Sequence, residues 1–423
     1  MYLLYNLTLG LVLIAVFLPY ALPMLLLERG GIRRRLGLLS SEDLLRLRRR
    51  DPIWIHAASV GEVSVLASVL APIQRVCPER AIIISTFTPT GLARARRALK
   101  NVDLFTLLPL DFHPIVQCLF QKIAPRSLLL AETEIWPTLI HIARRAGCRI
   151  GLLNGKISER GAARYRFAGS LFHEAIQSID LLALQSPEVA DRFLQLGARP
   201  ERVNVTGNLK FDVPELRRGA DRSHVRRSLG LSDERKIIVA GSTRDKEEEI
   251  LLRAWEKLRR HFGDLTLILA PRHLSRIGEV ERLGASFGQI ATKRSRISKD
   301  TGEADLILLD TMGELTSLYA AADAAFVGGS FVPIGGHNPM EPAAANVPVL
   351  FGPHMRQEGA DLLLRAGAAI SVKDEDELTE QLEKLLRNPA ERRRRGQAGV
   401  EIIARHRGMA QATVDLFVEA GVV

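Results

Sequence analysis

The chain has little of what marks a disulfide-stabilised, metal-binding or nucleic-acid-binding protein. Its 423 residues include only three cysteines, Cys77, Cys118 and Cys148, and this odd, widely spaced set favours reduced thiols over a disulfide framework or a zinc site. The ten histidines show no HxxxH or HExxH spacing, which counts against a histidine-based metal site. Aromatic residues make up 5% of the chain and do not interleave with its basic runs, so no nucleic-acid partner is expected.

Two nucleotide-binding signatures are also missing. The sequence contains neither GxxxxGK[ST] nor GxGxxG, which counts against a P-loop NTPase and a dinucleotide-dependent oxidoreductase. Positive charge, in contrast, is in excess, because 58 Lys and Arg against 48 Asp and Glu give a net charge of +10. Such a balance favours acidic partners such as anionic lipids or phosphorylated substrates.

Charged side chains are absent from the first 27 residues. The stretch Leu7–Leu27 is almost wholly apolar and is interrupted by Pro19 and Pro23; its length suits a bilayer that needs ~20 residues. Basic residues follow it from Arg29 onward, whereas a signal peptide has them in front. Because positive residues stay on the cytoplasmic side, residues 1–27 are predicted to be an uncleaved anchor with the rest of the chain in the cytoplasm. A hydrophobic helix lying in the interface, or packed on the protein, is the alternative.

Short apolar runs alternate with helical patterns along the rest of the chain. Six strands are predicted in the first half: Ile53–His56, Ala81–Thr86, Leu104–Pro109, Leu128–Ala131, Arg149–Leu153 and Leu181–Leu184. Five more follow a charged linker near residue 214: Lys236–Ala240, Leu265–Ala270, Leu306–Leu309, Ala324–Val327 and Val347–Leu350. Helical patterns then run from Glu375 to Ala420. The alternation predicts parallel sheets covered by helices, and thus an α/β protein with two Rossmann-like, doubly wound domains, 28–213 and 214–423, facing a ligand cleft.

Three loops in the second half follow predicted strands and precede helical patterns. They are Ala240–Arg244, Ala270–His273 and Val327–Pro342, and all but the second contain glycine. Glycines let a backbone approach a ligand closely, helix N-termini attract anions, and an arginine can pair bidentately with phosphate. Together the loops indicate a cradle for a nucleotide-sugar, although each alone is also ordinary turn chemistry.

Carboxylates follow two strands predicted in the first half. Glu62 comes after the first strand, and Glu132 and Glu134 come after the fourth. With Lys210, they suit acid-base chemistry and charge stabilisation, but the pattern alone favours for Glu62 a role at the helix dipole. The acidic run Asp374–Asp376 resembles a metal-binding motif of some glycosyltransferases; because it opens a predicted helix, the dipole role is favoured there too and no metal is expected.

Eight motifs, taken together, resemble the 3-deoxy-D-manno-octulosonic acid (Kdo) transferases of lipopolysaccharide biosynthesis. They are His56–Glu62 (HAASVGE), Leu130–Pro137 (LAETEIWP), Asn154–Arg160 (NGKISER), Gly207–Asp212 (GNLKFD), Pro271–His273 (PRH), Asp310–Leu315 (DTMGEL), Gly335–Ala343 (GGHNPMEPA) and Leu350–His354 (LFGPH). They occur in the family's order and extend over most of the chain, so the match is far more specific than any single loop.

This resemblance implies a GT-B fold and an inverting transfer of Kdo from CMP-Kdo to lipid IVA, without a metal or other cofactor. It also implies contact with lipids of the cell inner membrane. By motif, Glu62 is expected to be the general base, with Glu132 and Lys210 supporting the transition state. The expected CMP site consists of Pro271, Arg272, Met312, Gly313, Glu314, Asn338, Pro339, Met340 and Glu341. A membrane-associated GT-B enzyme with a UDP-sugar donor is the alternative.

The chain departs from the family's pattern at the rim of the expected donor site. After Gly241–Thr243 the family commonly has a histidine and later a glycine, where this chain has Arg244 and Lys246. Residues 355–358 replace an Asn-Phe pair that usually follows Phe-Gly-Pro-His. These departures concern donor affinity or loop closure rather than the reaction class.

Overall fold

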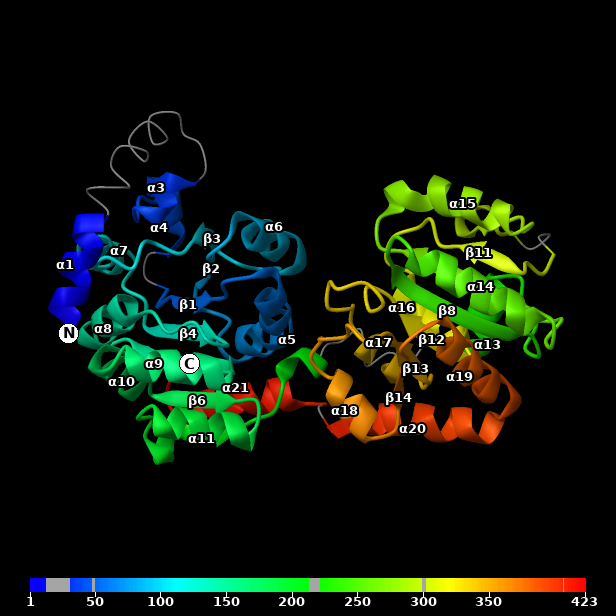
Figure 1. The fold of residues 1–423 in the computed structure, drawn as a ribbon. Helices are drawn as coiled ribbons and strands as arrows, with labels where there is room; N and C mark the ends of the chain where they lie inside the picture. Colours follow the sequence, from blue (N-terminus) through cyan, green and yellow to red (C-terminus); the bar gives the residue numbers. More distant parts are fainter. Residues whose placement is uncertain (13–30, 48–49, 213–220, 299–301, 406) are drawn as a thin grey trace. The chain divides into compact units, whose positions relative to one another are not determined.

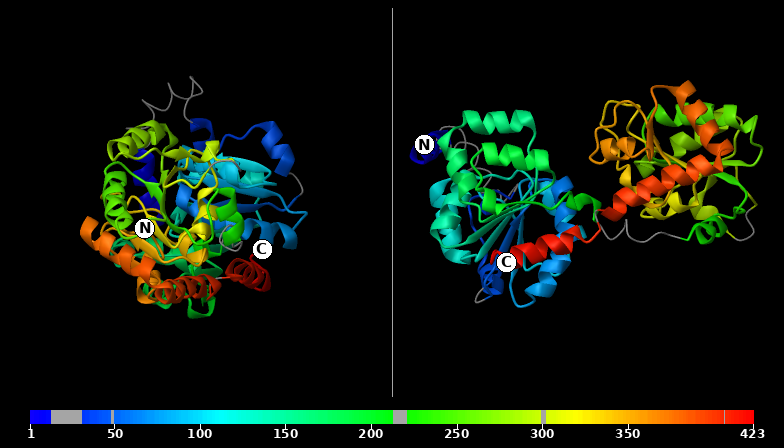
Figure 2. Two further views of the ribbon diagram at one scale, coloured as in Figure 1. Left: turned by 90° about the vertical axis from the view of Figure 1, so that its right-hand side faces the viewer. Right: turned by 90° about the horizontal axis from the view of Figure 1, so that it is seen from below.

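The computed structural model describes residues 1–12, 31–47, 50–212, 221–298, 302–405 and 407–423. They divide into two compact units, the first formed by Met1–Val213 with Gly408–Val423 and the second by Pro214–Arg407. Each unit is built on a parallel seven-stranded sheet with helices on both faces (Figures 1 and 2). The prediction of two doubly wound α/β domains is thus confirmed.

The sheet of the first unit has the strand order β3-β2-β1-β4-β5-β6-β7. Its strands are β1 (Ile53–His56), β2 (Ile82–Thr86), β3 (Leu104–Leu107), β4 (Ser127–Ala131), β5 (Arg149–Gly155), β6 (Leu181–Leu184) and β7 (Val203–Val205). Its helices are α1 (Tyr2–Val12), α3 (Ile32–Arg35), α4 (Ser41–Leu47), α5 (Val60–Val76), α6 (Pro89–Ala98), α7 (His113–Ile123), α8 (Pro137–Arg145), α9 (Glu159–Phe167), α10 (Ser170–Gln177), α11 (Pro187–Gln195) and α21 (Met409–Glu419). Two short 3₁₀ turns, η2 (Pro200–Arg202) and η3 (Leu209–Phe211), flank β7.

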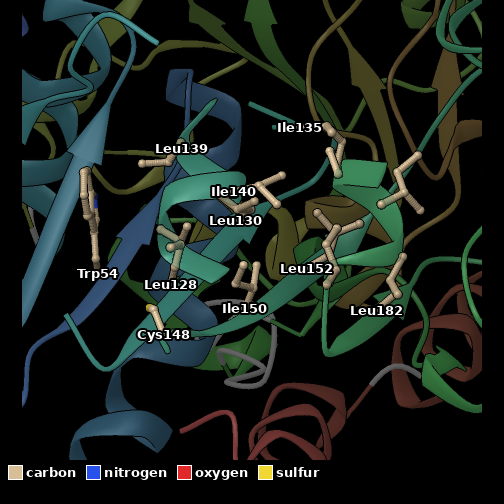
Figure 3. Close-up of a cluster of buried hydrophobic side chains, with 14 of the residues drawn as sticks. Trp54, Leu128, Leu130, Ile135, Leu139, Ile140, Cys148, Ile150, Leu152 and Leu182 are labelled. Carbon is tan, nitrogen blue, oxygen red and sulfur yellow. The ribbon is translucent and has the colours of Figure 1, made fainter. Parts of the chain in front are cut away.

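Alternate residues of these strands build one core on each face of the sheet. Leu128 and Leu130 of β4 pack with Trp54 and with α7, α8, α10 and α11 on one face (Figure 3). Leu129, between them, packs on the other face with Ile55, α5 and α21. This follows from the two-residue period of a strand, and because both faces are covered the strands are continuous apolar runs.

The second sheet has the strand order β10-β11-β9-β8-β12-β13-β14. Its strands are β8 (Lys236–Thr243), β9 (Leu265–Pro271), β10 (Thr292–Lys293), β11 (Leu306–Leu308), β12 (Ala324–Val327), β13 (Val349–Phe351) and β14 (Ala369–Ser371). Its helices are α13 (Arg222–Ser228), α14 (Glu247–Arg259), α15 (Ile277–Ser286), α16 (Leu315–Leu318), α17 (Met340–Ala344), α18 (Ala360–Arg365), α19 (Glu375–Arg387) and α20 (Pro389–Arg405). Helices α14, α15 and α19 cover one face, and α13 and α16 cover the other.

Three short strands are additional to the eleven that the apolar runs predict. They are β7, β10 and β14, and each is at or next to the edge of its sheet. Their sequences, VNV, TK and AIS, contain few large apolar side chains because an edge strand has less of its surface to bury. Hydrophobic periodicity therefore could not find them.

The C-terminal helix belongs to the first unit, although residues 408–423 were predicted to be part of the second domain. The carboxylate of Asp212 accepts hydrogen bonds from the backbone nitrogens of Gly408 (3.1 Å) and Ala410 (2.8 Å) at the start of α21. The ring of Phe417 lies against Gly151 of β5, where a Cβ atom would be only 2.1 Å from it. The position of α21 is thus fixed by Asp212 and Gly151, which are far away in the sequence. The sequence close to α21 therefore does not indicate which unit the helix joins.

The prediction of a membrane anchor over residues 1–27 is not supported by the part of the chain that the structure describes. Its first portion forms α1, an eleven-residue helix, and residues 13–27 lie outside the described residues. None of the helices formed by described residues combines the length and apolar character that crossing a membrane requires. Helix α1 instead contacts the first unit through its polar side chains, with Tyr5 donating to Asp111 (3.1 Å) and Asn6 accepting from the His113 nitrogen (2.9 Å).

Candidate functional site

The first sheet changes direction between β1 and β4. The chain runs outward from β1 through β2 to β3 on one side, and outward from β4 through β5 to β6 on the other. The loops that leave these two central strands therefore diverge at the carboxyl ends of the strands, which is where doubly wound sheets bind ligands. The carboxylates of Glu62, Glu132 and Glu134 follow these two strands.

Glu62 lies in the first turn of α5, directly after β1. Its carboxylate accepts hydrogen bonds from the Ala58 nitrogen (2.6 Å) and the Ser59 hydroxyl (3.0 Å). Burial, followed by the charges of Glu134 and Glu132, raises the pKa of Glu62 to about 7 in spite of these two bonds. A carboxyl group with this pKa accepts and releases a proton near neutral pH, as acid-base catalysis requires, whereas an ordinary helix-capping glutamate does not.

Glu132 is buried and is paired with two lysines. Its carboxylate lies 2.6 Å from the amine of Lys210 and 2.6 Å from that of Lys156. The backbone of Glu132 is left-handed, with φ +56°, a conformation that costs a non-glycine residue about 1–3 kcal/mol and is concentrated at functional sites. Glu132 and Lys210, to which the sequence analysis assigns one role, thus contact each other. Lys156, inside the NGKISER motif, is a residue that the sequence analysis did not single out.

The turn that carries Lys210 is fixed by Asn154 at the end of β5. Asn154 is fully buried, with φ +53°, and its side-chain oxygen accepts from the Leu209 nitrogen (2.9 Å) in η3. Two of the motifs, separated by about fifty residues, are thus joined by one hydrogen bond, so that Glu132 meets both lysines.

A second set of contacts places aromatic rings beside the acidic residues. Glu134 accepts from the Trp136 indole (2.8 Å) and lies 3.2 Å from the buried His56 ring. Trp136 stacks on the exposed Phe87 with 5.5 Å between ring centroids, and the Arg35 guanidinium lies 4.7 Å from the Phe87 ring. A flat apolar surface next to a cation is suited to a sugar ring that carries an anionic group. The sequence analysis missed it because these residues come from separate loops.

The second sheet changes direction between β8 and β12. The loops after these strands touch closely, since a Cβ atom on Gly328 would be 2.5 Å from the Ser242 carbonyl oxygen. The backbone nitrogens of Gly329 (2.6 Å), Ser330 (2.9 Å) and Phe331 (2.8 Å) all donate to the carboxylate of buried Glu247. These amides, expected from the sequence to be available to a ligand, are occupied by an internal anion.

The residues predicted to bind CMP follow the carboxyl ends of β9, β11 and β12. Pro271 is the buried last residue of β9, and Arg272 is exposed directly after it. In the turn after β11, Met312 is 78% exposed and Gly313 has φ +87°. Glu314 pairs with Arg294 at 2.9 Å.

The loop after β12 supplies the other four predicted residues. Asn338 donates to Glu341 (3.2 Å) and accepts from the Met340 nitrogen (3.0 Å), and Glu341 also accepts from the Thr316 hydroxyl (3.1 Å). Pro339 and Met340 are buried. Because β11, β9, β8 and β12 are neighbours in the sheet, all nine predicted residues lie along one edge of the second unit.

The acidic run that starts α19 has a structural role. Asp374 accepts from the Glu377 nitrogen (2.9 Å) as an N-cap, and Lys257 lies 2.8 Å from both Glu375 and Asp376. This agrees with the predicted role at the helix dipole.

Comparisons with known proteins match both units of the chain to glycosyltransferases. Residues 30–213 match the family described as 3-deoxy-D-manno-octulosonic-acid transferase (kdotransferase), and residues 332–415 match a family described as glycosyl transferase-like. The 3-deoxy-D-manno-octulosonic acid transferase of Haemophilus influenzae is 35% identical over 370 residues, which cover 86% of each chain. That of Aquifex aeolicus is 32% identical over 345 residues, covering 80% of this chain and 86% of the relative.

Among solved structures, a UDP-GlcNAc 2-epimerase from Neisseria meningitidis is similar with a TM-score of 0.59. It is 11% identical, over 87% of this chain and 99% of that one, which indicates a common fold alone. The sequence relatives decide the family, because they are 35% and 32% identical over 86% and 80% of this chain. The chain belongs to the 3-deoxy-D-manno-octulosonic acid (Kdo) transferase family of glycosyltransferases.

Proposed function

We propose that the protein transfers Kdo from CMP-Kdo to lipid IVA, the lipid A precursor, with inversion at the anomeric carbon. In this proposal the first unit binds the acceptor and the second unit binds the donor. The observation that carries it is the proton-accepting carboxylate of Glu62, whose pKa of about 7 suits the removal of a proton from a sugar hydroxyl, in a chain whose relatives are Kdo transferases.

The reaction is a single displacement. The acceptor oxygen forms a bond to the anomeric carbon of Kdo while the bond from that carbon to the phosphate of CMP breaks, and the hydroxyl proton passes to Glu62. Lys156 and Lys210 both lie 2.6 Å from the carboxylate of Glu132, and together these three groups would stabilise the changing charge of the transition state. CMP leaves as a phosphate monoester, whose charge Arg272 would neutralise.

The acceptor has features that the first unit could recognise. Lipid IVA is a disaccharide with two phosphates and acyl chains. The stacked pair Phe87 and Trp136 offers a surface for one face of a sugar ring, and Arg35 beside it offers a charge for a phosphate. Binding there would bring an acceptor hydroxyl close to Glu134, which contacts Trp136, and to its neighbour Glu62.

A transfer assay tests the proposed substrates. The purified protein should add Kdo to detergent-dispersed lipid IVA when CMP-Kdo is present, seen by mass spectrometry as product heavier by one or more Kdo residues. A panel of UDP-sugars serves as the comparison. Turnover with a UDP-sugar and none with CMP-Kdo would show that the donor is wrong and would favour the alternative GT-B activity.

We also propose that the N-terminal segment attaches the protein to the cytoplasmic face of the inner membrane. Helix α1 has an outward apolar surface, since Leu3, Leu4, Leu7 and Leu11 are 82%, 58%, 61% and 61% exposed. These positions lie on one side of a helix. Its polar side chains contact the protein instead, as the hydrogen bonds of Tyr5 and Asn6 show. An apolar surface directed away from its own protein is suited to a lipid layer.

The membrane attachment can be tested without disturbing the fold. Changing Leu3, Leu7 and Leu11 together to glutamate should weaken binding to phosphatidylethanolamine–phosphatidylglycerol vesicles by about tenfold or more, with an unchanged melting temperature. Phe167→Glu and Ile290→Glu are matched controls, because these side chains are 96% and 94% exposed but far from α1 in the sequence. Equal vesicle binding by the triple variant and the wild type would refute a role for α1.

A further inference from the structure

Arg244 lies at the point where the second sheet changes direction. It follows the last residue of β8, and its backbone nitrogen donates to Glu247 (2.9 Å), the same carboxylate that holds the glycine-containing loop after β12. Its half-buried side chain lies between two imidazoles, with Nη1 2.8 Å from His273 Nε2 and Nε 3.3 Å from His337 Nε2. Its position is therefore fixed by both its backbone and its side chain.

The charge of Arg244 is not neutralised by these contacts. A guanidinium can only donate hydrogen bonds, so each histidine accepts through Nε2, and neither supplies a negative charge. Burial, together with Arg244, Arg272 and His273, lowers the pKa of His337 to about 4, which agrees with a neutral ring. Among the described residues, no carboxylate pairs with the Arg244 side chain, whereas nearby Arg276 pairs with Glu248 (2.8 Å) and Glu279 (2.7 Å).

The fixed guanidinium has one edge that these contacts leave for a ligand. Nε and one Nη1 hydrogen are directed at the two histidines, which leaves three N–H groups, two on Nη2 and one on Nη1, for a ligand. The N–H groups of the Nη1 and Nη2 end of a guanidinium bind a carboxylate or phosphate, and do so bidentately where both nitrogens contribute. Arg272, at the end of the neighbouring strand β9, provides a second cation. The amides of Gly329, Ser330 and Phe331 cannot substitute for them, because Glu247 occupies these three.

We infer that Arg244 binds the carboxylate of the donor's acidic sugar, so that Arg244 and Arg272 divide the two anionic groups of one donor between them. The inference rests on the proposed function, in which CMP-Kdo has one phosphate and one sugar carboxylate. Two cations at adjacent strand ends match two anions in one ligand. Arg244 then selects an acidic sugar over a neutral one, because a neutral sugar would leave a desolvated guanidinium without a partner.

The test compares two ligands that differ in the sugar. For Arg244→Ala and for Arg244→Gln, which retains a donor for one histidine, the KM for CMP-Kdo should rise about 10–100-fold. The inhibition constant of CMP, which lacks the sugar carboxylate, should change less than about twofold. Arg253→Ala, which removes an exposed arginine of the same unit, is the control for net charge and should change neither value.

Each outcome decides the matter. If the inhibition constant of CMP rises as much as the KM for CMP-Kdo, Arg244 binds the phosphate or only supports the loops, and the assignment to the sugar carboxylate is wrong. If neither value changes, Arg244 does not contact the donor. Failure of the wild-type protein itself to use CMP-Kdo would refute the proposed function instead, so the two failures are distinguishable.

Discussion

Replacing Glu62 by glutamine is expected to lower turnover by about 10²–10⁴-fold, the usual contribution of a general base. The substitution retains the size of the side chain, and its amide oxygen can still accept from the Ala58 nitrogen or the Ser59 hydroxyl, so the local fold should persist. The affinity for CMP should stay the same. Steady-state turnover and CMP calorimetry on one purified variant measure both quantities.

The pH dependence gives an independent check. Because burial and Glu134 raise the pKa of Glu62 to about 7, the base form is lost as the pH falls through this value. Wild-type turnover should thus decrease about tenfold per pH unit below 7 and level off above it. Glu62→Gln should have lost this dependence. A wild-type profile that stays flat between pH 5 and about 8 would rule out Glu62 as the base.

Stability separates this role from that of a capping carboxylate. A carboxyl group with a raised pKa in the folded state contributes stability at low pH that is lost as the pH rises through about 7. Glu62→Gln should therefore melt no lower than the wild type above pH 7. Glu159→Gln is the matched control, since Glu159 is an exposed glutamate in the first turn of α9; it should lose a little stability and no turnover. If Glu62→Gln behaves like Glu159→Gln, the catalytic role is wrong.

The sequence predicts the two sheets well because their strands are buried on both faces. Runs such as Ile82–Thr86 and Ser127–Ala131 are fully buried, so nearly every position must be apolar and the run is visible without any knowledge of neighbours. The position of α21, in contrast, cannot be predicted in this way, because it depends on contacts with residues that are distant in the sequence. Asp212 and Gly151, which fix it, are about 200 residues or more away along the chain.

The candidate site of the first unit likewise has features that the sequence predicts and features that it does not. That functional carboxylates follow β1 and β4 could be predicted, because ligands bind at the carboxyl ends of parallel strands. The pKa of Glu62 could not, since it depends on how close Glu134 and Glu132 come, and a reference value near 4.3 predicts a permanently ionised group. The pairing of Lys156 with Glu132 likewise needs the left-handed backbone of Glu132, which no local pattern indicates.

In the second unit, the single change Glu247→Gln is expected to destabilise the loop after β12. Glu247 lies at the start of α14 and holds this loop through hydrogen bonds. Glu247 is fully buried. One carboxylate oxygen accepts from the nitrogens of Ser330 and Phe331, and the other accepts from those of Gly329 and Arg244. A glutamine must direct its NH₂ group at one of these two pairs. Two backbone donors then lose their acceptor, at about 1–3 kcal/mol for each buried unsatisfied group.

The expected loss of about 2–6 kcal/mol should lower the melting temperature of the second unit by roughly 10 °C. It should also weaken CMP binding, because the loop that leads to the predicted CMP-binding residues 338–341 depends on this carboxylate. Glu248→Gln is the matched control on the same helix. Glu248 is equally buried, but one oxygen accepts from the Thr243 hydroxyl and pairs with Arg276 (2.8 Å each), and its other oxygen has no hydrogen-bond partner among the described residues. A glutamine can place its amide nitrogen there and keep the oxygen contacts, so the loss should be only about 1 kcal/mol. Calorimetric melting of both variants measures the difference, and equal melting temperatures would show that the loop does not depend on Glu247.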